Sequence, residues 1–297
     1  MKINYIARLD PYNPSVTGGG EAIMRELMSF EHNNYISVVT PDKIHVYDES
    51  ADLNIFCDVF NLPNSPGFPE DFLDKAMTKP YVKFDNAYVD ICKEDYLPCY
   101  WDYPQECEKA CQPLAEKLYS GAMKCFFLSP LHRDQVMRKL ECTLVPYVIR
   151  PTIDAEMFKH ENKEVREIDY LYVAPLVEAK GIENVLEYLD ENGAEANRCV
   201  FIGACPSNVN PTELGMQWAE RVPYEELPEI MNQAKCLIHL PEWPEPMGRI
   251  VIEAALCGCN LVVNENVGAA SFDFELSDPD NYKDSIKEFW DEITKLA

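Results

Sequence analysis

The stretch Pro241-Glu242-Trp243-Pro244-Glu245-Pro246-Met247-Gly248-Arg249-Ile250-Val251-Ile252-Glu253 determines how the second half of the chain can fold. It follows an apolar run, 236–240, which predicts a buried strand. Its three prolines end that strand, because proline can neither join a sheet ladder nor continue a helix. A helix pattern begins after Pro246 and stops at Gly258. Another apolar run, 261–263, follows at once, so we predict a strand–loop–helix–strand unit of the parallel α/β kind.

Two carboxylates frame the start of this helix. Glu245 precedes it and Glu253 lies inside it, with seven residues between them. Met247, Gly248 and Arg249 would present backbone N–H groups at the helix N-terminus, where the partial positive charge suits a phosphate. Carboxylates on either side of a bound diphosphate would accept hydrogen bonds from sugar hydroxyls, which is the shape of a nucleotide sugar. The alternative is a pair of solvated glutamates with no ligand.

The same segment, continued by Ala254-Ala255-Leu256-Cys257-Gly258, resembles the E-x7-E segment of retaining GT-B glycosyltransferases, a group that includes glycogen synthases and many bacterial cell-surface sugar transferases. The resemblance implies an α/β fold of two Rossmann-like domains that face each other across a cleft. We expect an acceptor-side domain over 1–150 and a nucleotide-sugar-binding domain over 151–297, with the last helix packed back on the first domain. It also implies retaining hexosyl transfer from a nucleoside-diphosphate sugar, with no metal and no other cofactor.

The resemblance also assigns roles to residues. In the family the first Glu contacts the donor sugar and the second binds the donor ribose. Lys180 resembles the lysine that reaches the donor diphosphate, although the preceding Gly-Arg pair of the family is replaced by Ala174-Pro175. Arg249 would add positive charge as the nucleotide leaves. The residues to which we assign catalytic roles are Glu245, Asp85 and Arg249. The predicted donor-binding residues are Lys180, Glu253, Met247, Gly248, Ile250, Tyr224, Gly18, Gly19 and Gly20.

Two of these predictions concern the first half of the chain. Gly18-Gly19-Gly20 lies between a predicted strand and a predicted helix, where glycine lets the backbone approach a ligand. The alternative for this run is a tight turn. Asp85 follows the predicted strand that begins at Tyr81, at a place where the family often has His-Asp and this chain has Phe84-Asp85. We predict that Asp85 contacts a sugar hydroxyl; the alternative is a strand-end residue that closes a turn.

Four of the twelve cysteines fall close together, at Cys92, Cys99, Cys107 and Cys111. Four thiolates can hold zinc or an iron–sulfur cluster. However, the spacing lacks the paired C-x2-C pattern of recognisable zinc sites. We therefore expect reduced thiols and no metal, with a metal site and redox-linked pairing as alternatives. Most other cysteines lie in apolar segments and are expected to behave as small core residues.

Composition narrows the choice of partners. The 297 residues include 51 acidic and 26 basic side chains, a formal net charge of −25, which repels nucleic acids and anionic lipids. We find neither a membrane-length apolar run nor a signal peptide, so we expect a cytoplasmic protein without strong membrane binding. The expected partners are a nucleotide sugar and a saccharide or other small acceptor. The chain is short for the resembling family, which leaves open either a compact acceptor site or a partner protein that completes the first domain.

Two other classes of function stay open at this point. A catalytically degenerate GT-B scaffold, acting as a binding or regulatory protein, is favoured by the missing His and Gly-Arg positions. The retained Glu245, Glu253 and Lys180 oppose it, so the enzyme is the leading prediction. An epimerase of related fold would be expected to contain carboxylate–His base pairs, which we do not find in the sequence.

Overall fold

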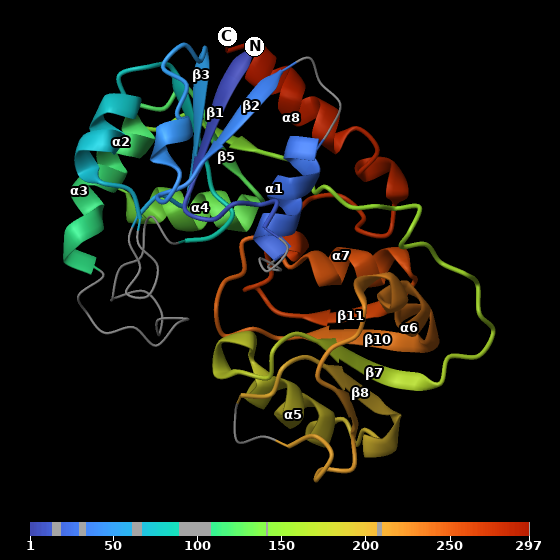
Figure 1. The fold of residues 1–297 in the computed structure, drawn as a ribbon. Helices are drawn as coiled ribbons and strands as arrows, with labels where there is room; N and C mark the ends of the chain where they lie inside the picture. The colour runs from blue at the N-terminus through green and yellow to red at the C-terminus, as the bar shows by residue number, and fades with distance from the viewer. Residues whose placement is uncertain are drawn as a thin grey trace. The chain divides into compact units, whose positions relative to one another are not determined.

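The computed structural model describes residues 1–13, 19–29, 34–60, 67–88, 108–140, 142–206 and 210–296. The chain divides into two compact units, drawn as a ribbon in Figure 1. The first unit comprises residues 1–152 and 284–297, and the second unit comprises residues 153–283. Both units are parallel α/β structures.

The first unit is built on a six-stranded parallel sheet with the order β2-β1-β3-β4-β5-β6. Its strands are β1 (Lys2–Ala7), β2 (Tyr35–Val39), β3 (Leu53–Cys57), β4 (Tyr81–Phe84), β5 (Cys125–Phe127) and β6 (Pro146–Val148). Its helices are α1 (Gly19–Ser29), α2 (Glu70–Ala76), α3 (Glu108–Ser120), α4 (Pro130–Lys139) and α8 (Ser285–Thr294). Every residue of β3 and β4 is buried, as parallel strands covered on both faces require.

The last helix of the chain, α8, belongs to the first unit and lies beside α1 (Figure 1). The indole Nε1 of Trp290 donates to the carbonyl of Leu27 on α1 over 2.8 Å. Phe289 makes edge-to-face contacts with Phe84 and Phe126 on β4 and β5. These apolar contacts fix α8 to the first unit although 131 residues of the second unit precede it in the chain.

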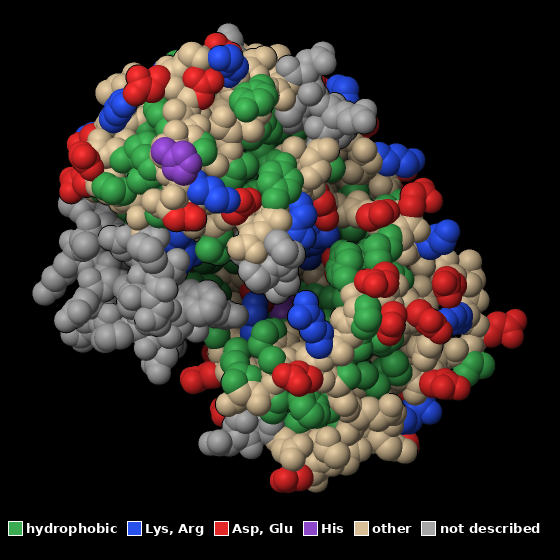
Figure 2. All heavy atoms as spheres, in the orientation of Figure 1, with side chains coloured by type: hydrophobic (Ala, Val, Ile, Leu, Met, Phe, Trp, Pro, Cys, Tyr) green, Lys and Arg blue, Asp and Glu red, His purple; other side chains and the backbone are tan. Residues whose placement is uncertain are grey.

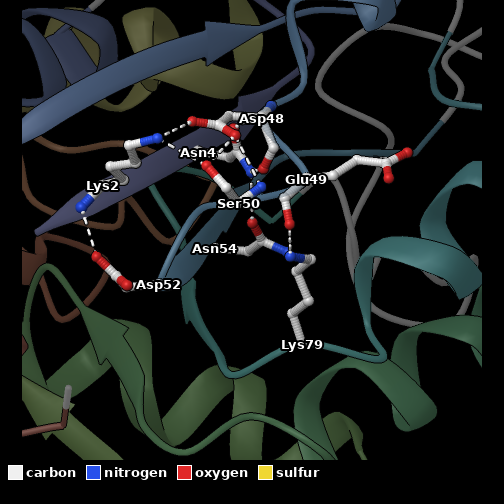
Figure 3. Close-up of polar contacts among 8 residues, drawn as sticks. All are labelled: Lys2, Asn4, Asp48, Glu49, Ser50, Asp52, Asn54 and Lys79. Atoms are coloured by element: carbon white, nitrogen blue, oxygen red, sulfur yellow. Dashed lines mark hydrogen bonds and ion pairs between the residues drawn. The ribbon is translucent and has the colours of Figure 1, made fainter.

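Two buried asparagines fix the register of β1 and β3. Asn4 lies opposite Asn54, and its Nδ2 donates to Asn54 Oδ1 over 2.9 Å. Asn4 also bonds both backbone groups of Asp48, within a cluster that includes Lys2 and Ser50 (Figure 3). A slip of one residue would leave both amides unpaired, because it moves side chains to the opposite face. The same register extends along β1 and β3 to their carboxyl ends.

The second unit has a five-stranded parallel sheet with the order β11-β10-β7-β8-β9. Its strands are β7 (Ile168–Val173), β8 (Cys199–Ile202), β9 (Gln217–Ala219), β10 (Ala234–His239) and β11 (Asn260–Val263). Its helices are α5 (Ile182–Glu191), α6 (Leu227–Gln233) and α7 (Arg249–Leu256). Tyr172, Val185, Leu189, Phe201 and Ile238 are central to a core shared by α5, β7, β8 and β10. Because the chain starts at β7 and proceeds first to one side and then to the other, the strand order reverses between β7 and β10.

Charged side chains are dispersed over the surface. Figure 2 shows Asp and Glu side chains spread over the visible face with Lys and Arg among them. Within the described residues, no helix is both long enough and apolar enough to cross a membrane.

His132, in the first turn of α4, should make the stability of the protein pH-dependent. The side chain is fully buried against Tyr88 and Phe127, and its Nδ1 accepts from the Leu128 N–H. Burial, reinforced by the charge of Lys83, lowers the pKa of His132 to about 3. In the unfolded chain this histidine becomes protonated below pH ~6.5, whereas in the folded protein it stays neutral until the pH approaches its folded pKa. The free energy of unfolding is therefore highest above pH ~6.5 and decreases as the pH falls toward the folded pKa.

We therefore expect the wild-type protein to lose about 2 kcal/mol more than His132→Asn between pH ~6.5 and pH ~5, since each pH unit is worth about 1.4 kcal/mol per proton. Asparagine keeps an acceptor near the position of Nδ1 but does not titrate. Urea unfolding of both proteins at the two pH values measures the difference. Parallel pH dependences would contradict the prediction.

Candidate functional site

The loops that follow β7 and β10 meet at the switch point of the second unit, the usual ligand position of an open parallel sheet. The loop after β7 ends in a short helical turn, Glu178–Lys180, followed by Gly181 with φ of +68°. A Cβ on Gly181 would lie 1.7 Å from the carbonyl oxygen of Leu240, just after β10. Trp243 N–H also donates to the Ala179 carbonyl over 3.2 Å. The absence of a side chain at Gly181 therefore lets the two loops close on each other.

Glu245 is the centre of this region. It is buried, and its Oε1 pairs with Lys180 Nζ while its Oε2 lies 2.9 Å from His239 Nε2. Burial by itself would raise the pKa of Glu245, but the positive charges of His239 and Lys180 outweigh burial and hold the pKa well below its ordinary value. Glu245 is therefore an ionised carboxylate with a fixed orientation, suited to accept hydrogen bonds from hydroxyl groups.

His239 was not among the predicted site residues. It closes β10 and is buried, and its Nδ1 has no hydrogen-bond partner among the residues that the structure describes. Because a carboxylate oxygen only accepts, the hydrogen bond between the two side chains is donated by His239 Nε2 to Glu245. The sequence signal was a histidine at the last position of an apolar strand, directly before a proline-rich loop. We interpreted it only as part of the strand.

The loop that carries Glu245 is tied to the loop after β11 by backbone hydrogen bonds. Glu245 N–H donates to Asn266 O over 2.7 Å, and Gly268 N–H donates to Glu245 O over 3.1 Å. The side-chain amides of Asn264 and Asn266 both donate to Pro241 O over 2.9 Å. These bonds pair backbone groups in a segment where three prolines supply no donors.

Gly248 turns this loop into α7. It has φ of +76°, and a Cβ on it would lie 3.0 Å from Glu245 Oε2. Met247 beside it is buried, whereas Ile250 and Arg249 in the first turn are partly exposed. The first turn of a helix leaves backbone N–H groups without intrahelical partners, so the start of α7 offers donors beside the Glu245 carboxylate.

Glu253, Tyr224 and Arg249 form a second cluster around α7. Glu253 is buried, and its Oε1 accepts from Tyr224 Oη over 2.7 Å and from Arg249 Nε over 3.4 Å. Arg249 also donates to Tyr224 Oη over 3.1 Å. Burial and then the negative charge of Glu253 raise the pKa of the Tyr224 hydroxyl, so it remains a donor at neutral pH. The structure thus brings together two predicted donor-binding residues, Glu253 and Tyr224, and one predicted catalytic residue, Arg249, from two separate segments.

The predicted residues of the first half are placed differently. Gly19 and Gly20 form the start of α1, and Gly18 lies outside the described residues. Asp85 is fully buried, and its carboxylate pairs with Lys83 and accepts from the Tyr119 hydroxyl. Asp85 therefore anchors a buried network within the first unit, and its contact with a sugar stays a prediction.

The cysteine cluster also lies mostly beyond what the structure describes. Cys92, Cys99 and Cys107 are outside the described residues, and Cys111 lies in α3 with its side chain not described. No disulfide joins the thiols that the structure describes, and no group of metal-binding side chains occurs among the described residues.

Comparison with known proteins fits this geometry. Residues 153–272, which lie within the second unit, match the family described as glycosyl transferases group 1. No curated protein sequence matches the chain. Sucrose-phosphate synthase from Thermosynechococcus elongatus is structurally similar, with a TM-score of 0.64 at 12% identity over 99% of this chain and 90% of that one.

Two further solved structures are similar. HepE from Anabaena in complex with UDP has a TM-score of 0.64 at 14% identity, over 100% of this chain and 92% of that one. The structure described as trehalose-6-phosphate from E. coli bound with UDP-2-fluoro glucose has a TM-score of 0.57 at 10% identity, over 100% of this chain and 96% of that one. The fold is therefore GT-B, as predicted, and the group 1 match over the second unit supports glycosyl transfer.

Proposed function

We propose that the protein transfers a sugar from a nucleoside-diphosphate sugar to an acceptor with retention of the anomeric configuration. The observation that carries the proposal is the pair of buried carboxylates around the start of α7, Glu245 held by His239 and Lys180, and Glu253 held by Tyr224 and Arg249. Because similar structures were solved with UDP or with a UDP-sugar, we propose UDP as the carrier.

In this proposal the two carboxylates bind opposite ends of the donor. Glu253 accepts hydrogen bonds from the ribose hydroxyls, replacing those from Tyr224. Glu245 accepts hydrogen bonds from hydroxyls of the transferred sugar. The diphosphate between them meets the first-turn N–H groups of α7 and the ammonium of Lys180, which is one-fifth exposed and thus within reach of solvent.

The chemistry then needs stabilisation of the leaving diphosphate and of an oxocarbenium-like sugar. The bond between the anomeric carbon and the diphosphate oxygen breaks, the acceptor oxygen bonds to the same face of that carbon, and the acceptor proton passes to the departing diphosphate. Lys180, Arg249 and the helix start stabilise the negative charge that develops on the diphosphate. The ionised Glu245 fixes the sugar and favours positive charge on its ring.

A second candidate is a degenerate GT-B scaffold that binds a ligand without transfer. It is favoured by Ala174-Pro175, which follows β7 where the resembling family has Gly-Arg, since this removes one phosphate-binding arginine. Arg249, which pairs with Glu253 at the start of α7, would supply part of the phosphate binding of the missing arginine. The enzyme remains the better-supported function because both carboxylates and Lys180 are kept.

Release of UDP from a panel of UDP-sugars, with simple sugars and sugar phosphates as acceptors, tests this proposal. We expect UDP release with at least one donor. Proton NMR of the product should show that the new glycosidic linkage keeps the anomeric configuration of the donor. An inverted product would contradict retention. Nucleotide binding without release for any pair would favour the degenerate scaffold.

A further inference from the structure

The two partners of the Glu245 carboxylate differ in how freely they can move. Among the residues that the structure describes, Lys180 and His239 are its only polar partners, one at each oxygen. The Lys180 side chain is 21% exposed and carries its ammonium on a flexible four-carbon stem. The His239 side chain is 2% exposed and belongs to the last residue of β10, which pairs with β11 at this position. Lys180 can therefore leave the carboxylate, whereas His239 is held against it.

The packing of β10 does not call for a histidine at its end. His239 Nδ1 is buried and has no hydrogen-bond partner in the described part of the chain, so Glu245 is the only polar contact of the ring there. A buried polar atom without a partner is costly. Leu237 and Ile238, the two preceding residues of the strand, are buried and apolar. An apolar residue at position 239 would avoid that cost, which points to Glu245 as the reason for the histidine.

The ion pair between Lys180 and Glu245 competes with the binding of a diphosphate. A diphosphate carries more negative charge than one carboxylate, so it attracts the ammonium more strongly. As Lys180 moves toward the diphosphate, Glu245 Oε1 becomes available to a sugar hydroxyl. A buried carboxylate that has lost its cation would tend to take up a proton, because burial disfavours the charged form. His239 Nε2 remains 2.9 Å from Oε2 and opposes that loss of charge.

We propose that His239 is the positioning residue that keeps Glu245 ionised and oriented while Lys180 is engaged with the donor diphosphate. His239 touches neither the donor nor the acceptor and acts only through Glu245. Gly248 keeps the contact open, since a Cβ at this position would lie 3.0 Å from Glu245 Oε2, the oxygen that His239 holds. The inference rests on the proposed function, because it needs a donor whose sugar contacts Glu245.

Two amide variants that differ by one methylene test the inference. His239→Gln places an amide donor near the position of Nε2, whereas His239→Asn places the same group near Nδ1, too short to reach Glu245. UDP release is followed at saturating concentration of the UDP-sugar that the wild type turns over fastest. We expect His239→Gln to keep turnover within about threefold of the wild type and His239→Asn to lose about tenfold or more, the effect of one hydrogen bond to a charged group.

Binding of UDP shows whether the variants are folded and separates positioning from nucleotide affinity. Because His239 acts through a residue that contacts the sugar, both variants should bind UDP within about threefold of the wild type while their turnovers differ. Equal turnover of His239→Gln and His239→Asn would overturn the role of His239.

A pH profile provides a readout that a merely structural role would not move. In His239→Leu no donor remains at Oε2, so burial should raise the pKa of Glu245 once Lys180 has moved to the diphosphate. A carboxyl with a raised pKa is protonated at low pH and recovers its charge as the pH rises. The turnover of His239→Leu relative to the wild type should therefore increase from pH ~6 to pH ~9, where strongly shifted buried glutamates titrate.

The remaining outcomes also decide between the two claims. A ratio that stays constant with pH in a His239→Leu protein that binds UDP would overturn the inference. If His239→Leu does not bind UDP, the comparison of His239→Gln with His239→Asn decides alone. A wild type that binds no UDP, or releases none from any UDP-sugar, would instead overturn the proposed function, and this inference would fail with it. Failure of the inference alone leaves the turnover of the wild type intact, so the two failures are distinguishable.

Discussion

Glu245→Gln is expected to lower the turnover of a UDP-sugar by about 10²–10³, the usual effect of removing one group that stabilises a transition state. The substitution keeps the size of the side chain but removes the charge that His239 and Lys180 hold in place. Because Glu245 is proposed to contact the sugar and not the nucleotide, the dissociation constant of UDP should stay within a few-fold of the wild type. UDP release from UDP-sugars, followed at saturating donor, gives the turnover.

Glu242→Gln provides the matched control. Glu242 lies three residues earlier in the same loop, is exposed, and accepts from the Asn184 amide over 2.8 Å. It is expected to keep nearly full turnover, since an exposed polar contact contributes little. The assignment of Glu245 would fail if both variants kept wild-type turnover, or if Glu245→Gln lost UDP affinity as strongly as turnover.

Gly181→Ala should cost about 3–5 kcal/mol of stability in the second unit, which combines a left-handed backbone at an L-residue with overpacking. The backbone at Gly181 has φ of +68°, and the added Cβ would lie 1.7 Å from the Leu240 oxygen. That oxygen belongs to backbone, so no side-chain rotation relieves the clash. If Gly181→Ala folds, the loop that carries Lys180 must move away from the loop that carries Glu245. We therefore expect this variant to bind UDP poorly.

Gly193→Ala separates the cost of the left-handed backbone from the cost of overpacking. Gly193 follows α5 with φ of +61°, and a Cβ on it would have no neighbour within 4 Å. It should therefore cost only about 1 kcal/mol, the conformational part alone. Urea unfolding of both variants measures the difference. Equal destabilisation would mean that the two loops adjust freely and that Gly181 does not hold the site together.

The segment that organises the second unit could be predicted from sequence because its signals are local. The apolar run before Pro241 became β10, the helix pattern after Pro246 became α7, and the next apolar run became β11. Proline and glycine punctuate these elements at fixed places whatever the rest of the chain does.

Elements with weaker local signals were missed or given the wrong length. α3, α6 and β9 were not predicted, since α6 is only 7 residues long and β9 is a partly exposed edge of 3 residues. The largely apolar stretch 52–60 predicts a strand that continues to Phe60, but β3 ends at Cys57, because Asp58 leaves the extended conformation with φ of +45°.

The candidate site depended on contacts between distant segments, which one sequence does not contain. The resemblance named Glu245, Glu253 and Lys180, but it gave no reason to place His239 on Glu245. Nor did it indicate that the hydroxyl of Tyr224 bonds Glu253, 29 residues further on. These partners follow from the parallel sheet, which brings strand ends together regardless of their separation in sequence.

Binding of UDP tests the central claim most directly, measured as the shift in thermal midpoint for the wild type, Glu253→Ala and the control Glu242→Ala. At a hundred times its dissociation constant a ligand stabilises by roughly 2.7 kcal/mol, which is a shift of several degrees. We predict this shift for the wild type and for Glu242→Ala, and its loss in a folded Glu253→Ala. An equal shift in Glu253→Ala, or no shift with UDP, GDP or ADP in the wild type, would contradict a nucleotide-sugar site at α7.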